Sequence, residues 1–296
     1  MTDGDFEQKA AAGAPFSADE AARVLASPDL TSVGHLGEVA RKRASGDVIT
    51  FSRVAEVPGG AFPASAGHAG EVRLTGLVAS VDEAVELVRR GRTFAGTIPL
   101  TGFSAAHLFE VCGRNPDALE SCARRLREAG LDGVAECPLD AFADVDEVAS
   151  VVRVLERGGL AVWRLTIDRA SLGERLPLME RAAAVRATSS RVQAFAPLPR
   201  HDSADQPATG YDDVRTVAVA RLVCATIPFI QVDWPLYGPK LAQVALMYGA
   251  NDVDGVAPTD AADLGARRSP IEDIRRQIRA AAGEPVERNG RYEPTS

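Results

Sequence analysis

Short β-prone segments and capped helices alternate along almost the whole chain. "SADE", from Ser17, and "SVDE", from Ser80, have the spacing of a capping box at a helix start. "NPDALESCARRLREAG" begins at Asn115 and ends at Gly130, a residue type that commonly terminates helices. Segments rich in β-branched and apolar residues begin at residues 48, 71, 94, 132, 160, 192, 229 and 252. This alternation predicts successive strand–helix units and a parallel sheet.

The number of these units favours a closed α/β barrel of the TIM type, (β/α)8, and leaves open whether the ring closes completely. The competing doubly wound sheet usually carries a glycine-rich phosphate turn after an early strand. Residues 57–70 are glycine-rich but lack the G-x-G-x-x-G spacing. We therefore predict one barrel domain over residues 17–288, with helices 17–43 as an N-terminal extension. The N-terminus, 1–16, and the tail, 289–296, are expected to be flexible.

Charge and hydropathy limit the partners that this chain is expected to have. The formal net charge is -8, and basic residues alternate with acidic ones along the sequence. This pattern argues against binding to nucleic acid or to an anionic membrane surface. The chain has no run of about 18 apolar residues, and its first residues do not have the pattern of a signal peptide. We expect a cytoplasmic protein.

The four cysteines are widely spaced and form no C-x-x-C pair. They occupy positions 112, 122, 137 and 224. Their spacing matches neither a zinc ribbon nor a dithiol motif. The sequence thus predicts free, buried thiols and no metal site.

Residues 231–255, "QVDWPLYGPKLAQVALMYGANDVDG", contain most of the candidate ligand-binding residues. In parallel barrels the ligand lies over the carboxyl ends of the strands. Asp233 and Trp234 end the seventh strand, where an indole can stack on a ring and a carboxylate can accept hydrogen bonds. The eighth strand is expected to bring its own polar residues to the same opening. The candidates on this stretch are Asp233, Trp234, Lys240, Gln243, Asn251 and Asp252.

These residues also have purely structural interpretations. The apolar positions of "GPKLAQVALMYG" have the spacing of a core-facing helix. Asn and Asp beside Gly255 can cap a helix or form a tight turn. A calcium loop is disfavoured, because the twelve-residue pattern aligned on Gly255 would place Ala250 at its first position and Ala261 at its last.

Four segments, in order along the chain, resemble one known family. They are "DLTSVGHLGEVARKRASGDVITF", "VQAFAPL", "AVARLVCATIPFIQVDWPLYGPKLAQVALMYGANDVDG" and "AAGEPVERNGRY". They are similar to the aminofutalosine synthase and dehypoxanthinyl futalosine cyclase branch of the radical S-adenosylmethionine enzymes, which serves futalosine-dependent menaquinone synthesis. The resemblance implies a barrel and, in the family, a four-iron cluster bound by C-x-x-x-C-x-x-C after the first strand. Three thiolates hold three irons and leave the fourth open for the cofactor.

The chain departs from the family pattern at this loop. Residues 52–70, "SRVAEVPGGAFPASAGHAG", contain no cysteine. After the fourth strand, Glu136 is the one residue that corresponds to the family's acid. We therefore expect no iron–sulfur cluster and no other cofactor.

Two functions are consistent with this sequence. The first is a non-radical accessory or ligand-binding protein in or near menaquinone biosynthesis, with a nucleoside-like ligand and an intact paralogue as expected partners. The second is an enzyme with cluster-independent acid/base chemistry on a nucleoside-like or aromatic acid substrate, through Asp233, Asp252 or Glu136. The first is favoured because no nucleophile and base occur at a recognisable spacing. Catalytic residues are not assigned from the sequence.

Overall fold

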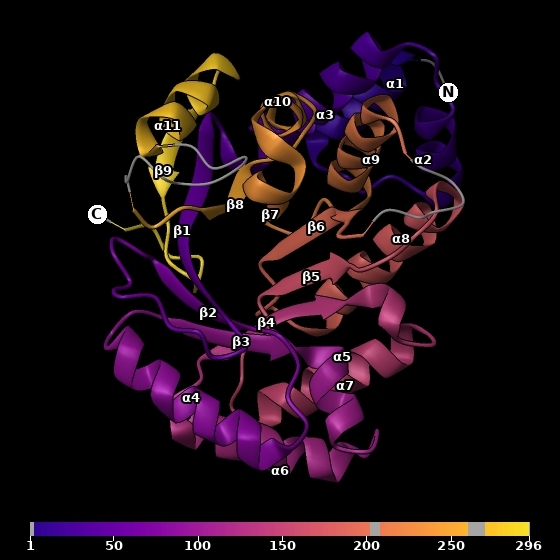
Figure 1. Cartoon of the computed structure of the whole chain (residues 1–296). Helices are drawn as coiled ribbons and strands as arrows, with labels where there is room; N and C mark the ends of the chain where they lie inside the picture. The colour runs from indigo at the N-terminus through magenta and orange to yellow at the C-terminus, as the bar shows by residue number, and fades with distance from the viewer. Residues whose placement is uncertain (1–2, 202–207, 260–269, 296) are drawn as a thin grey trace.

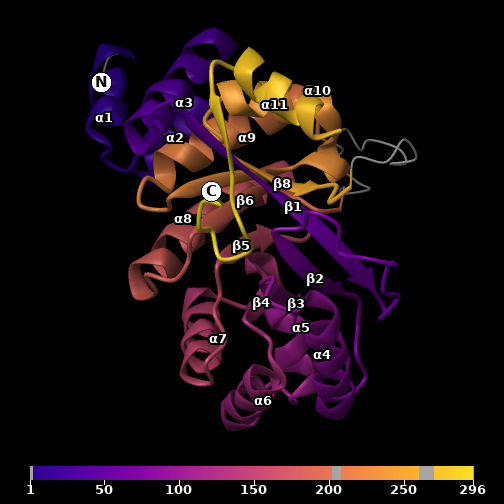
Figure 2. The same cartoon turned by 90° about the vertical axis from the view of Figure 1, so that its left-hand side faces the viewer.

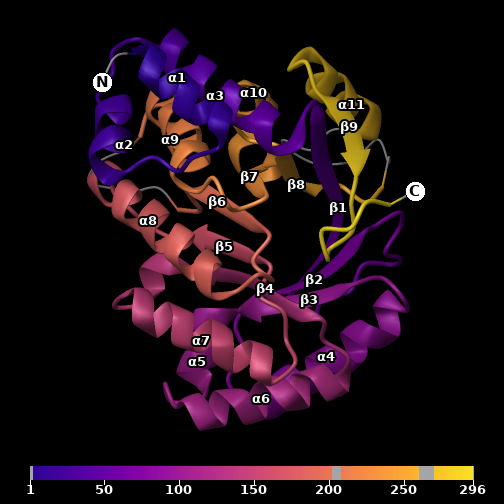
Figure 3. The ribbon, with the colours of Figure 1, turned by 180° about the vertical axis from the view of Figure 1, so that it is seen from behind.

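Eight parallel strands close into a barrel in the computed structural model, which describes residues 3–201, 208–259 and 270–295. The ring runs from β2 in order to β8 and then to β1, which pairs with β2 and closes it. Figures 1 and 3 show the ring with helices around its outside. This confirms the predicted barrel. The strands are β1 (Val48–Pro58), β2 (Glu71–Thr75), β3 (Leu100–Ser104), β4 (Gly133–Pro138), β5 (Arg164–Ile167), β6 (Ala194–Pro199), β7 (Phe229–Asp233) and β8 (Asp252–Val256).

Helices follow most of the strands and cover the outside of the ring. No helix within the described ranges is both long and apolar enough to span a bilayer. The helices after β1 are α4 (Val81–Ala95), α5 (Ala105–Val111), α6 (Pro116–Ala129), the short η1 (Leu139–Ala141), α7 (Val145–Arg157), α8 (Leu172–Thr188), α9 (Gly210–Val223), α10 (Trp234–Met247) and α11 (Ile271–Ala280).

The N-terminal extension consists of three helices before β1. They are α1 (Asp3–Ala12), α2 (Ala18–Leu25) and α3 (Leu30–Ser45). Helices α2 and α3 pack on α9, and α1 packs on α3 (Figure 2). The capping box expected at Ser17 is present, because its hydroxyl accepts from the Glu20 amide and Glu20 accepts from the Ser17 amide. Although residues 1–16 were expected to be flexible, α1 is held by Phe6, whose ring lies 5.3 Å from that of Phe16. Mobility of this segment in solution stays a prediction.

A ninth strand lies outside the ring, where the long strand β1 has two neighbours on one edge. Strand β9 (Glu284–Glu287) pairs with residues 48–51 of β1, and β2 pairs with residues 54–58. Residues 288–295 then cross the amino-terminal end of the barrel. The Tyr292 hydroxyl accepts from Gln231 at 3.0 Å, and Arg291 donates to Asp132 at 2.9 Å. The tail expected to be flexible thus contacts the barrel, and its mobility stays a prediction.

Charged side chains fill part of the barrel interior. Asp254 of β8 accepts from Arg73 of β2 at 2.8 and 3.0 Å and also from Arg164 of β5. All three are at most 3% exposed. Burial alone would raise the pKa of Asp254, but the two guanidinium groups hold this pKa well below its usual range. The Asp254 carboxylate therefore ties three strands together inside the barrel.

A second buried pair lies closer to the amino-terminal end of the barrel. Asp252 accepts from Arg288 at 2.6 and 2.7 Å, from the Thr50 hydroxyl at 2.5 Å and from Gln231 at 2.6 Å. Because Arg288 follows β9, this pair fastens the C-terminal segment to β8. The barrel interior thus depends on matched charges as well as on apolar packing.

We expect Asp254→Ala to lower the free energy of unfolding by about 3–5 kcal/mol, because it leaves buried Arg164 without a carboxylate partner and leaves Arg73 with Glu71 alone. Denaturant unfolding followed by circular dichroism measures the change. Asp273→Ala is the control, since Asp273 forms a surface ion pair with Arg276 at 2.8 Å and its loss should cost at most about 1 kcal/mol. Equal losses for the two variants would contradict the prediction.

Candidate functional site

Two adjoining cavities open at the carboxyl ends of the strands. The first, about 240 Å³, lies over β1 to β4, and the second, about 370 Å³, lies over the ends of β6 and β7. Glu56 and Arg200 line both cavities, so the two form one site with two parts. This is the end of a parallel barrel where ligands bind. The first part also includes Phe103, Ser104, His107 and Glu136, and the second includes His201, Asp233, Pro235 and Leu236.

Arg200, directly after β6, lies at the centre of this site. Its Nε is 3.2 Å from a carboxylate oxygen of Glu136, and its Nη2 is 3.8 Å from one of Asp233. Burial alone would lower the pKa of Arg200, but the two carboxylates raise it above its usual value. Arg200 is therefore a permanent cation that joins the two parts of the site.

Three carboxylates lie on the described walls of the two cavities. They are Glu136 and Asp233, which lie beside Arg200, and Glu56, which lines both parts. Arg73 and Arg164 also line the first part, but both pair with the Asp254 carboxylate inside the barrel. The site is thus suited to groups that donate hydrogen bonds, such as hydroxyls and amines.

Asp233 has both a structural and a chemical role. Its carboxylate accepts from the Leu236 amide at 2.9 Å and caps the start of α10. The residue is 8% exposed. Burial first, and then the charge of Asp254, raise its pKa above the usual value. A carboxyl group with a raised pKa in a ligand cavity is a candidate proton donor or acceptor.

His201 and Asp168 form a pair at the rim of the second part. The His201 Nδ1 lies 2.8 Å from a carboxylate oxygen of Asp168. Asp140 fixes the loop that carries Asp168, because its carboxylate accepts from the amides of Asp168 and Arg169 at 2.8 and 2.6 Å. The imidazole is therefore oriented by a carboxylate that is itself held in place.

Phe103 has a strained backbone at the end of β3. Its φ angle is 62°, in the left-handed region, and the side chain is 3% exposed. For a bulky residue this conformation costs of order 1–3 kcal/mol, and such strain gathers at functional sites. Phe103 lines the first part of the site, so the strain occurs next to the ligand cavity.

Of the residues proposed from the sequence, the structure brings Glu136 and Asp233 to this site. Trp234 is 1% exposed and lines neither part, and its indole nitrogen has no hydrogen-bond partner in the described chain. Lys240 and Gln243 also line neither part. They lie beyond Gly238, where the helix is kinked at φ 78°. The indole that was expected to stack on a ring, and the side chains of Lys240 and Gln243, are therefore not part of the cavities.

The expectation that Asn251 and Asp252 line the same opening is wrong. Both lie at the amino-terminal end of β8, which begins at Asp252. The Asn251 side chain accepts from Arg221 at 2.5 Å and from the Ile230 amide at 2.9 Å. Asp252 is paired with Arg288. "NDVDG" has the composition of a turn, yet it forms a strand because its carboxylates meet arginines inside the barrel.

Sequence reasoning missed Glu56, Arg200 and the pair of His201 with Asp168. The available signal was their position, since Asp168 and Arg200 directly follow a strand and His201 is the next residue after Arg200. Glu56 is the ninth residue of an eleven-residue strand. Strand β1 continues well past residues 48–51, which pair with β9, toward the carboxyl end of the barrel. This extra length brings the Glu56 carboxylate to the cavity.

The cysteines do not provide a set of three thiolates in one place. Cys112 follows α5, Cys122 is in α6, Cys137 is in β4 and Cys224 follows α9. Burial raises the pKa of Cys137 and of Cys224 to about 12. No cluster of three His, Cys, Asp or Glu side chains suited to a metal occurs in the described stretches. The side chains present do not fit a cluster held by three thiolates.

The barrel has counterparts of the same fold among solved structures. Methylornithine synthase (PylB) has a TM-score of 0.66 at 15% identity, with 95% of this chain and 97% of that chain covered. HydG, a maturase of the [FeFe]-hydrogenase, has a TM-score of 0.64 at 11% identity over 97% of this chain and 76% of that chain. These similarities establish the fold.

Sequence comparison places the chain more narrowly. Residues 195–296 match the family described as CofH/MqnC C-terminal region. Aminodeoxyfutalosine synthase of Streptomyces coelicolor is 42% identical over 94 residues, 30% of this chain and 24% of the synthase. The synthase of Thermus thermophilus is 28% identical over 238 residues, 70% of this chain and 63% of the synthase. The chain is therefore related to this radical S-adenosylmethionine branch, as its sequence motifs indicate.

A second group of relatives comes from methanogens. The 5-amino-6-(D-ribitylamino)uracil--L-tyrosine 4-hydroxyphenyl transferase of Methanopyrus kandleri is 28% identical over 242 residues. The match covers 71% of this chain and 65% of the transferase. The chain thus spans less than two thirds of the length of each of these two synthases and of the transferase.

We expect Asp233→Asn to change how stability depends on pH. The raised pKa of Asp233 means that the folded protein keeps this proton where the unfolded chain, with a pKa of about 3.9, has lost it. The free energy of unfolding of the wild type therefore falls as pH rises from about 4 through the raised pKa. The variant lacks this contribution, so its stability relative to the wild type should increase over the same range.

Urea unfolding at several pH values from about 4 to 8 measures this difference. Asp29→Asn is the control, because hydrogen bonds from Ser32 lower the pKa of Asp29; its pH-dependent effect lies mainly below about pH 4, so its difference from the wild type should be nearly constant over this range. A difference between wild type and Asp233→Asn that is constant with pH would contradict the prediction.

Proposed function

We propose that this protein is a ligand-binding barrel without an iron–sulfur cluster, which acts as a non-radical accessory protein in or near menaquinone biosynthesis. The observation that carries the proposal is the combination of an open, charged cavity at the carboxyl ends of the strands with a β1 loop that contains no cysteine. An intact, cysteine-bearing paralogue is the proposed partner. The cytoplasm is the proposed compartment.

The loop after β1, residues 59–70, is held in place by contacts near both of its ends. The ring of Phe62 lies 5.3 Å from that of Phe94 in α4. Arg90 of the same helix stacks on Phe62 and donates to the Gly60 carbonyl at 3.2 Å. At the other end, the His68 amide donates to Pro258 at 2.9 Å. The loop is thus fastened to α4 and to the chain after β8, and it contains no cysteine, which supports a role without a cluster.

The walls of the site favour a polar, nucleoside-like ligand. Glu56, Glu136 and Asp233 offer acceptors for sugar hydroxyls or an exocyclic amine, and Arg200 offers donors. Phe103 and Leu77 add apolar surface to the first part. Leu77 is 81% exposed at the mouth of the cavity, where a ring could cover it. The names of the relatives, which contain aminodeoxyfutalosine and ribitylaminouracil, are consistent with this ligand class.

A second candidate is an enzyme with acid/base chemistry on a nucleoside-like or aromatic acid substrate. It is favoured by the pair of His201 with Asp168, in the same cavity as Asp233 with its raised pKa. A histidine whose Nδ1 is held by a carboxylate presents its Nε2 as a proton donor or acceptor. Glu136 stays in this candidate set, whereas Asp252 leaves it because it lies at the other end of the barrel. Product formation during ligand titration, lost in His201→Gln, would favour this candidate.

The first prediction from the proposal concerns the cluster. After anaerobic reconstitution with iron and sulfide, we expect no iron above background. With S-adenosylmethionine and dithionite, we expect no 5'-deoxyadenosine, because three thiolates are not available. The Thermus thermophilus synthase, treated in parallel, tests whether the reconstitution conditions work. Near-stoichiometric iron with product would overturn the proposal.

The second prediction concerns the ligand. We expect aminodeoxyfutalosine or adenosine to bind in calorimetric titration, and Arg200→Gln to weaken binding by roughly tenfold or more, since a hydrogen bond to a charged group is worth about 1.5–3 kcal/mol. The control is Arg191→Gln, because Arg191 is exposed and precedes the same strand at the opposite end of the barrel. That variant should bind within about twofold of wild type. No saturable binding by the wild type would reject a nucleoside-like ligand.

A further inference from the structure

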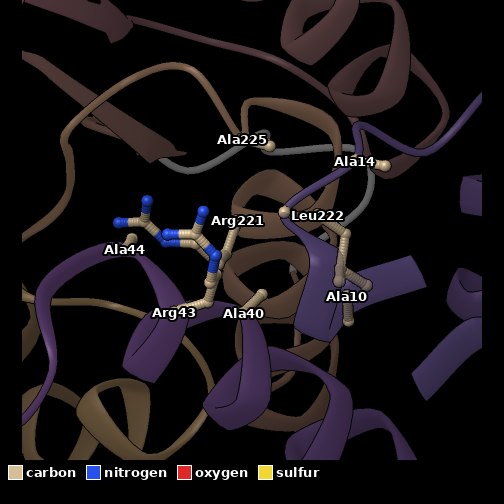
Figure 4. A pocket seen from close by; sticks show the side chains of 9 residues that line it. Ala10, Ala14, Ala40, Arg43, Ala44, Arg221, Leu222 and Ala225 are labelled. Atoms are coloured by element: carbon tan, nitrogen blue, oxygen red, sulfur yellow. The ribbon is translucent and has the colours of Figure 1, made fainter. Parts of the chain in front are cut away.

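A smaller cavity lies outside the barrel, where the N-terminal helices meet α9. Its volume is about 140 Å³, and its walls come from the turn after α1, one face of α3 and the end of α9 (Figure 4). Six of its nine lining residues are alanine or glycine. Arg43 and Arg221 are the only charged residues among its described lining residues, and in Figure 4 their guanidinium groups fall on the same side of the cavity. The cavity thus combines small, neutral walls with two cations.

Arg221 has only neutral hydrogen-bond partners in the described chain. It is 1% exposed and donates to the carbonyls of Ile227 and Gly249 at 3.1 Å, and to the Asn251 side chain at 2.5 Å. Burial lowers the pKa of Arg221 to about 10. A buried charge that is balanced only by dipoles is costly, because a carboxylate or another anion would normally compensate it.

A neighbouring arginine adds to this excess of positive charge. Arg41 of α3 is fully buried, and its charge contributes to the lowered pKa of Arg221. Its Nη1 donates to the Gly46 carbonyl at 3.3 Å, while its Nε and Nη2 have no partner among the described residues. Arg43 on the same helix is exposed at the cavity rim. Within the described ranges, none of these three arginines lies within ion-pair distance of a carboxylate.

We propose that this cavity binds a small oxyanion, namely a phosphate group, with Arg43 at the rim and Arg221 in the wall as its ligands. Guanidinium groups bind phosphate through paired, charge-assisted hydrogen bonds. A water molecule in the liquid occupies about 30 Å³, so the cavity has room for a group of phosphate size. The bound anion compensates the buried arginines and joins α3 to α9. It therefore fastens the N-terminal extension to the barrel.

Calorimetry with inorganic phosphate at constant ionic strength, with chloride as the replacement anion, tests the site. We expect saturable binding with one phosphate per chain and at least tenfold weaker binding by Arg43→Gln. Lys42→Gln is the matched control: it removes one positive charge from the adjacent residue, whose side chain is 49% exposed and paired with Glu38. This variant should stay within twofold of wild type. No saturable binding by the wild type, or equal losses in both variants, would overturn the proposal.

A second variant tests the position of the site. Ala44 lines the cavity and is exposed, so Ala44→Glu can place a carboxylate beside the arginines. We expect this variant to unfold at a higher temperature without phosphate and to lose the stabilisation that phosphate gives the wild type. A retained response to phosphate would contradict binding in this cavity. Glycerol phosphate distinguishes the sources: equal affinity assigns the site to a phosphomonoester, and binding of inorganic phosphate alone assigns it to the free ion.

Discussion

The ion pairs of Asp254 with Arg73 and Arg164 are the interaction on which the barrel interior depends. An apolar interior could pack with many side-chain combinations, but a buried carboxylate requires its cations at fixed positions. The pairs therefore set how β2, β5 and β8 lie relative to one another. They also form the floor of the ligand site, because the same two arginines line the first cavity from below. Stability and site geometry are coupled through this layer.

Charge compensation also explains why the C-terminal segment belongs to the barrel. Asp252 lies two residues before Asp254 on β8, nearer the amino-terminal end of the barrel. Its buried carboxylate needs a cation of its own, and strands β1 to β8 do not supply one. Arg288 supplies it from beyond β9. Tyr292 then covers Arg288, with its ring 3.9 Å from the guanidinium carbon. A segment that reads as a loose polar tail in the sequence thus completes the amino-terminal end of the barrel.

The fold could be predicted from the sequence because its signals are local. Capping residues such as Ser17 and Asn115 act within one helix turn, and strand periodicity needs only a few residues. The site depends on contacts between distant segments, which sequence spacing does not reveal. Arg200 meets Glu136 only because β4 and β6 end on the same side of the barrel. Trp234 was misassigned for a related reason: its neighbour Asp233 faces the cavity, whereas the indole of Trp234 is buried.

The segment that matches the CofH/MqnC C-terminal region has structural reasons for its sequence. Residues 195–296 supply Asp254, Asp252 and Arg288, which hold the barrel interior, and Arg221 with Asn251, which joins α9 to the start of β8. Any barrel built this way needs these partners, whatever chemistry occurs at its opening. The same segment also supplies Arg200, His201 and Asp233 to the opening at the opposite end of the barrel. Its sequence is therefore constrained both by the barrel interior and by the ligand site.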